Sequence, residues 1–365
     1  MNLGLCAVDI FVLSSFLLTM IFYKKSTQLL HQRATLRKCG FALADYFSKR
    51  FLRASPRFTA VACFVWMFPF ESQMAYFLNG DSKPGDFDLF KVLTFEFSQW
   101  YRVFWTLPLE IAYYFLIPFC VLVVIRFKKV WWLPFIPLYY WIWSARWTEY
   151  RDAHQPLQPH LLMFISGFMA AVIYLKIDEA MKCNTELFAL KKWQVVSVRA
   201  IEWTTLALLL SVCFRGLLFH WLFTNPAPEG KGGTQFINLH VGLLIVIEML
   251  LPSELSTVFE WSLLRYWGKI SFSVYLLHSF VVYSPQIHGQ KNYYDALFSQ
   301  LFLTCALVTA SYYAVEYPSQ VLSTRISKAL ARLESDGALP RTSSTFALYK
   351  PVATIGDHSS HVSAA

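Results

Sequence analysis

The feature that most constrains this chain is a series of apolar runs, each about as long as a membrane is thick. A hydrocarbon core of about 30 Å is crossed by about 20 helical residues. The nine runs cover residues 3–22, 57–78, 100–125, 130–145, 158–175, 201–222, 236–252, 267–284 and 296–317. Because lipid offers no hydrogen bonds to the backbone, each run must be helical. The sequence therefore predicts an all-α fold, a polytopic transmembrane helical bundle.

Composition agrees with that prediction and excludes other classes of protein. Hydrophobic residues make up 56% of the chain and charged residues 15%, with a mean hydropathy of +0.41, which does not suit a soluble domain. The formal charge of +9 is carried by short loops between the runs, so it does not indicate a nucleic-acid-binding face. The seven cysteines form no Cys/His cluster, and no metal site is expected.

The distribution of basic residues predicts the orientation in the membrane. Alternate loops hold 24 of the 32 Lys and Arg residues, and the positive-inside rule places these loops in the cytosol. The N-terminus is then outside and the C-terminus cytosolic. Residues 1–320 are predicted to form the transmembrane domain, and residues 321–365, rich in Ser, Ala and Thr, a disordered cytosolic tail.

Seven ionisable residues inside the apolar runs are candidates for a function, because a charge at the centre of a span costs about 2.5–3.5 kcal/mol. They are Glu110, Arg215, His220, His240, Glu248, His278 and Glu316. Each can be read as a functional group or as a buried polar residue that ties helices together. Two stand out. Glu110 follows Thr106 by one turn, and His278 shares a helical face with Ser271 and Tyr275, which predicts the polar wall of a pocket.

The basic stretch KRFLRASPRF, residues 49–58, allows two interpretations. It can be an anchor at the cytosolic side of the membrane. Alternatively, Arg50 and Arg53 lie at i and i+3 on one helix, so that both guanidinium groups can bind phosphates. The spacing alone leaves both interpretations open.

Taken together, five stretches resemble the acyltransferase-3 family of integral membrane O-acyltransferases. They are VDIFVLSSFLLT (8–19), KRFLRASPRF (49–58), FWTLPLEIAYYFLIP (104–118), WGKISFSVYLLHSF (267–280) and YYAVEYPSQ (312–320). They occur in the family's order and extend over about residues 1–320. Ser15 stands where the family usually has glycine.

The resemblance implies a reaction and a set of site residues. An acyl-CoA, with acetyl-CoA as the expected form, binds from the cytosol, and its acyl group passes to a hydroxyl of a carbohydrate, lipid or small metabolite. Arg50 and Arg53 would hold the phosphates of the donor, Glu110 and His278 would line the pocket, and Glu316 would be a structural polar anchor.

One departure from the family concerns the proton acceptor that a hydroxyl nucleophile needs. The family has a span carrying an arginine and a catalytic histidine before the segment at residues 8–19, and no such span precedes that segment here. The sequence is therefore expected to be that of a truncated member whose activity is in doubt. His278, oriented by Glu110, and His154, near Glu149 and Asp152, are the candidate substitutes.

Two other classes of protein stay open at this stage. A solute transporter would share the spans, the prolines within them and the buried charges, although the chain shows no internal repeat. A non-catalytic pseudoenzyme would bind the donor without turning it over.

Overall fold

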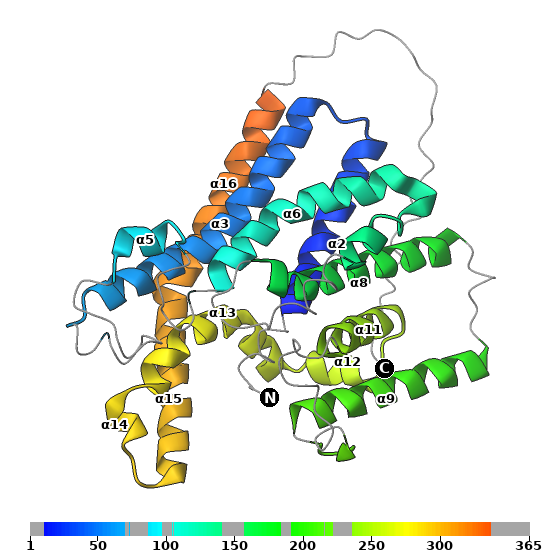
Figure 1. The fold of residues 1–365 in the computed structure, drawn as a ribbon. Coiled ribbons are helices and arrows are strands. Elements are labelled where there is room, and N and C mark those ends of the chain that lie inside the picture. Colours follow the sequence, from blue (N-terminus) through cyan, green and yellow to red (C-terminus); the bar gives the residue numbers. More distant parts are fainter. Residues whose placement is uncertain are drawn as a thin grey trace, which may run out of the picture.

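The computed structural model describes residues 11–69, 73, 87–96, 104, 106–140, 157–183, 191–214, 216–221 and 236–336. Within these ranges every regular element is a helix, which confirms the all-α prediction. The elements are α2 (Phe11–His31), α3 (Leu36–Trp66), α5 (Leu89–Leu93), α6 (Thr106–Phe127), η1 (Lys128–Val130), α8 (Leu157–Cys183), α9 (Lys192–Cys213), α11 (Phe236–Leu250), α12 (Glu254–Phe259), α13 (Ser262–Val282), α14 (Pro285–His288), α15 (Tyr293–Ser311), η2 (Tyr312–Glu316) and α16 (Tyr317–Asp336). Figure 1 shows their arrangement.

Four helices of the described chain are long and apolar enough to cross a membrane, judged by length and composition. They are Thr106–Val130, Leu161–Cys183, Lys192–Val212 and Tyr293–Ser335, and a shorter apolar helix covers Asn238–Leu250. Every predicted span except the fourth overlaps one of the described helices along most of its described residues. The chain is thus an integral membrane protein built from helices.

The predicted span at 130–145 is the exception. Lys128 has a φ of 47°, residues 131–134 form a turn, and a short helix covers 135–140 before the described segment ends. Pro134 ends the turn, and Pro137 lies in the first turn of the helix that follows, where proline is tolerated. The segment lies beside α8, and residues 141–145 of the predicted span lie outside the described residues.

The basic region between the first two predicted spans is mostly helical. Helix α2 continues to His31, and α3 begins at Leu36, where the hydroxyl of Thr35 accepts a hydrogen bond from the Lys38 N–H. Lys49 and Asp45 form an ion pair of 2.7 Å one turn apart on α3. Local capping and i, i+4 pairing of this kind let a basic, hydrophilic segment stay helical beyond the membrane.

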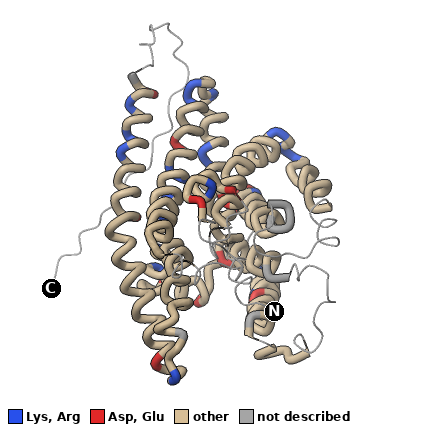
Figure 2. Tube along the Cα trace, turned by 60° about the vertical axis from the view of Figure 1, so that its left-hand side comes forward, with Lys and Arg blue, Asp and Glu red and all other residues tan. Residues whose placement is uncertain are grey.

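The last described helix, α16, runs antiparallel along α3 (Figure 1). Near its end the Arg37 guanidinium donates a hydrogen bond of 2.8 Å to the carbonyl of Leu333. Residues 321–336, predicted as part of a disordered tail, are therefore helical because they pack against α3; residues 337–365 lie outside the described chain. Figure 2 shows the Lys and Arg residues of both helices gathered toward the same end of the pair.

The largest buried cluster joins α2, α6, α8 and α11. At its centre Ser15 has no exposed surface; its hydroxyl donates a hydrogen bond of 2.5 Å to the Phe164 carbonyl and lies 2.6 Å from the Tyr113 hydroxyl. Gly167 faces this point from α8, and a Cβ there would come within 2.2 Å of the Val12 carbonyl oxygen. The close approach of α2 and α8 therefore depends on a small residue, as is common between membrane helices.

We predict that Gly167→Ala lowers the melting temperature of the purified protein in detergent. The added methyl group meets backbone of α2, and overpacking of this kind costs about 1–3 kcal/mol. Gly242→Ala is the matched control, because its Cβ faces the same helix α8 with a nearest contact of 3.6 Å, which is ordinary packing. Equal melting temperatures for the two variants would show that α2 and α8 do not pack as closely as described.

Candidate functional site

Arg57 of α3 lies at a junction of three helices. Its guanidinium forms an ion pair of 2.7 Å with the Glu316 carboxylate, and each side chain is only 2% exposed. Arg57 also donates to the Ser273 hydroxyl of α13 at 3.1 Å, and its charge lies 4.3 Å from the centre of the Phe272 ring. One buried cation thus holds α3, α13 and η2 together.

Glu316 ends a π-helical turn, η2, which joins α15 to α16. Its carboxylate accepts hydrogen bonds from Ser273 and from Gln320, each at 3.1 Å. A π turn inserts an extra residue into a helix and changes the direction of the side chains at that point. Glu316 is therefore a polar anchor that couples the last two helices to α3, in agreement with the role the sequence suggested.

The polar face of α3 continues from Arg57 toward Arg53 and Arg50. These positions are i+7, i+3 and i on one helix, so the three side chains share a face. All three arginines are close enough to Glu110 of α6 to interact with it electrostatically. Glu110 is 8% exposed and accepts a short hydrogen bond from the Tyr114 hydroxyl one turn later. The structure thus brings together Arg50, Arg53 and Glu110.

The positive charges of Arg50 and Arg53 are not fully neutralised by the described residues around them. Neither forms an ion pair within the described residues, although Arg57 beside them does. The Nε of Arg50 is buried without a hydrogen-bond partner, and its guanidinium stacks over Tyr46 at 5.9 Å. Arg53 is exposed. Two arginines on one helical face, neither in an ion pair within the described residues, form a surface that can bind an anion.

His278 lies on α13, on the other side of the junction. Its Nδ1 is 3.1 Å from the Val274 carbonyl oxygen and 2.8 Å from that of Tyr275. A carbonyl can only accept, so the proton belongs on Nδ1 and Nε2 keeps a lone pair. The Tyr275 ring lies 6.2 Å from the imidazole, and its hydroxyl interacts with Thr106 and, electrostatically, with Glu110.

The structure does not bring His278 and Glu110 into direct contact. The hydrogen bond of Glu110 goes to Tyr114, and those of His278 go to its own helix. The predicted stripe of Ser271, Tyr275 and His278 also needs correction. Ser271 is exposed and bonds to the Gly268 carbonyl, whereas Ser273 and Ser279 of α13 are buried. Spacing alone therefore placed Ser271 wrongly on the inward face of α13.

The remaining candidates are structural or lie outside the description. Glu248 accepts a hydrogen bond of 2.6 Å from Ser253 and lies 3.4 Å from Arg199, in a network that ties α9 to α11. His220 and His240 each interact with other groups of the protein. Arg215, Glu149, Asp152 and His154 fall outside the described residues.

Two residues of this site were not singled out from the sequence. Arg57 was counted with the basic loop, and Tyr114 with the apolar run of α6. The signal for Arg57 was present, since residues 50, 53 and 57 follow the i, i+3, i+7 rule for one helical face. No local pattern could have paired Arg57 with Glu316, because that contact is set by how α3 and α16 pack.

The fold and the site together define an all-helical integral membrane protein with buried, paired charges. A family model described as an acyltransferase domain matches residues 1–316, and the chain belongs to this acyltransferase-3 family. The match ends at Glu316, the residue that pairs with Arg57. No curated protein and no solved structure matches the chain. Membership in the family makes the protein a membrane acyltransferase by class.

We predict that Glu316→Gln strongly destabilises the protein. It leaves the Arg57 charge buried without its counter-ion, and removal of one partner of a buried pair costs about 3–5 kcal/mol. Thermal unfolding in detergent measures the effect.

Asp45→Asn is the control, since it breaks the ion pair with Lys49 on the same helix α3, where the side chains are 31% and 46% exposed. That exposed pair contributes at most about 1 kcal/mol. A loss for Glu316→Gln no larger than for Asp45→Asn would mean that the Arg57–Glu316 pair does not support the fold.

Proposed function

We propose that this protein transfers an acyl group, acetyl in the simplest case, from acyl-CoA to a hydroxyl of a carbohydrate, lipid or small metabolite. The donor reaches the site from the cytosolic side, where the basic ends of α3 and α16 lie. Arg50 and Arg53 bind its phosphates, and Glu110 and His278 belong to the reaction site. The single observation that carries the proposal is that Arg50 and Arg53, which form no ion pair within the described residues, lie beside a buried glutamate in a chain of an acyltransferase family.

The charges on α3 support donor binding. A CoA ester carries several phosphate charges, and guanidinium groups bind phosphate oxygens through two parallel hydrogen bonds. Arg57 is already neutralised by Glu316, so the charge left for a ligand is that of Arg50 and Arg53. Glu110 opposes part of it, which favours a site that is positive but not so strongly charged that it retains CoA after the transfer.

The reaction needs a base for the acceptor hydroxyl, and His278 is the proposed one. Its Nε2 takes the proton while the hydroxyl oxygen attacks the thioester carbonyl carbon. A C–O bond forms, the C–S bond breaks, and the proton returns to the sulfur of CoA. The contacts of Nδ1 with two carbonyls hold the ring in the tautomer that this step requires. Glu110, whose carboxylate is held by the Tyr114 hydroxyl, would offset part of the positive charge of the arginines. It would not orient His278.

We predict that Arg53→Ala weakens binding of CoA by about tenfold or more, the value of a lost charge-assisted hydrogen bond. Isothermal titration of the purified protein with CoA and with 3′-dephospho-CoA measures it, and Arg50→Ala should behave in the same way. Lys38→Gln is the control, because it removes an exposed charge from the same helix away from Glu110. Wild-type affinity in both arginine variants would refute the assigned phosphate site.

We predict that His278→Gln abolishes transfer of a labelled acetyl group from acetyl-CoA to acceptors of a hydroxyl panel, with CoA affinity unchanged. Glutamine keeps a hydrogen-bonding group but cannot accept the proton at neutral pH. Glu110→Gln should lower the rate and change CoA affinity as well, since Glu110 interacts with the arginines. Normal turnover by His278→Gln would remove His278 as the base, whereas CoA binding by the wild type without any transfer would indicate a pseudoenzyme.

A further inference from the structure

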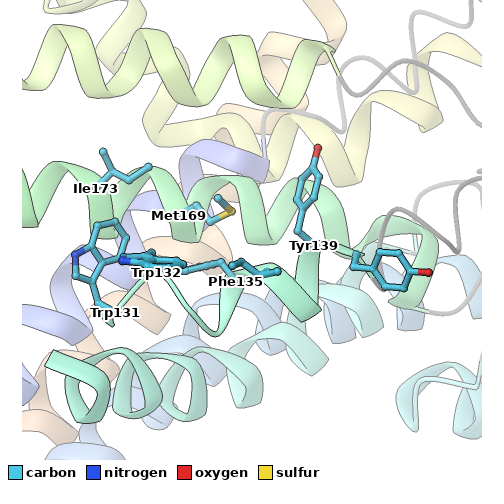
Figure 3. Close-up of a pocket in the computed structure, with 8 residues that line it drawn as sticks. Trp131, Trp132, Phe135, Tyr139, Met169 and Ile173 are labelled. Atoms are coloured by element: carbon cyan, nitrogen blue, oxygen red, sulfur yellow. The ribbon is translucent and has the colours of Figure 1, made fainter. Parts of the chain in front are cut away.

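An open groove with a volume of about 700 Å³ lies between the segment 131–140 and helix α8, apart from the site around Arg57. Figure 3 shows its lining, which is aromatic or aliphatic: Trp131, Trp132, Phe135 and Tyr139 from the first segment, and Met169 and Ile173 from α8. The volume falls within the range of about 300–1,000 Å³ that is usual for small-molecule sites. In the figure the ring nitrogen of Trp131 and the hydroxyl of Tyr139 point away from its middle.

The sequence explains why this groove is not closed by packing. After α6 the backbone of Lys128 adopts a left-handed conformation, and the turn at 131–134 ends at Pro134. A helix follows over the described residues 135–140, with Pro137 in its first turn. A long regular helix could lie against α8 along its whole length, whereas this interrupted segment presents flat aromatic rings that leave a gap beside Met169 and Ile173.

Three exposed cations precede the groove in the chain. Arg126, Lys128 and Lys129 are exposed and form no ion pair within the described residues. Lys129 is two residues from Trp131, so their Cα atoms are at most about 7.6 Å apart. A lysine side chain can therefore place its ammonium group at the Trp131 end of the groove. This corner also ends the candidate span Thr106–Val130, where the headgroups of a bilayer would lie.

We propose that this groove binds one anionic glycerophospholipid, with an acyl chain along the aromatic lining and the phosphate held by Lys128 and Lys129. The lining is almost entirely apolar, which suits a hydrocarbon chain better than a polar ligand. The unpaired cations select for net negative charge in the headgroup, as basic pockets on the cytoplasmic side of membrane helices do. Trp131 and Trp132 lie at the height of the ester groups, where tryptophan is favoured.

The first test compares lipids on the purified full chain in detergent by native mass spectrometry. Dioleoylphosphatidylglycerol should bind at one saturable site and about 25-fold more tightly than dioleoylphosphatidylcholine, since each of the two lysines contributes about fivefold. The double variant Lys128→Gln/Lys129→Gln should lose this preference, about fivefold for each lysine. Equal binding of the two lipids by the wild type would overturn the proposal, because the groove would then hold bulk lipid only.

Lys191→Gln/Lys192→Gln is the matched control. Lys191 and Lys192 form a second exposed lysine pair, also followed closely by a tryptophan, Trp193, and that tryptophan lines no part of the groove. The control should keep the preference for phosphatidylglycerol. If both double variants lose it equally, general attraction of the basic surface explains the binding and the proposal is wrong.

The acyl chain is tested without changing the fold. Dihexanoylphosphatidylglycerol, whose chains are too short to fill the groove, should bind at least tenfold more weakly than the dioleoyl lipid. Trp132→Ala, which removes a 49% exposed side chain of the lining, should reduce binding of the dioleoyl lipid. Displacement of that lipid by palmitoyl-CoA at lower concentration would instead assign the groove to the acyl donor and overturn the phospholipid proposal.

Discussion

The buried ion pair between Arg57 and Glu316 is the contact on which the arrangement around it depends. Both charges are removed from water, so each is tolerable only while the other is in place. Ser273 completes the pair by bonding to both partners, which fixes α13 as well. The ion pair and Ser273 thus fix α3, near the start of the chain, in one position relative to α13 and η2, near its end.

This position also decides which way the rest of α3 faces. Because Arg57 faces Glu316, Arg53 and Arg50, which lie one and two turns earlier on α3, face the side of α6 that carries Glu110. The same helix therefore has one arginine that pairs with a carboxylate at 2.7 Å and two that form no such ion pair within the described residues and can bind a ligand. The division of roles follows from the partners of each residue and not from their type, since all three are arginines on one face.

How much the sequence could predict differs between levels. Membrane-span length, apolar composition and one-sided charge were enough for the all-helical membrane class, because these properties are local. Apolar composition did not reveal that residues 131–134 form a turn, so that the described helix in the predicted span at 130–145 begins only at residue 135. Composition also did not reveal that the basic connection between the first two predicted spans is mostly helical, where Thr35 and the Lys49–Asp45 pair stabilise α3. At the site, i, i+3 spacing identified Arg50 and Arg53, but the choice between Ser271 and Ser273 required the rotation of α13, which packing sets.

The distance in sequence between Arg57 and Glu316 has a consequence for how the protein is made. Arg57 enters the membrane region early in translation, and at about 5–20 residues per second its counter-ion is synthesised on the order of tens of seconds later. During that interval a guanidinium group destined for burial must be kept near water or near lipid phosphates. Arg57 on α3 can therefore be neutralised only after the chain has been translated as far as Glu316, where the match to the family model ends.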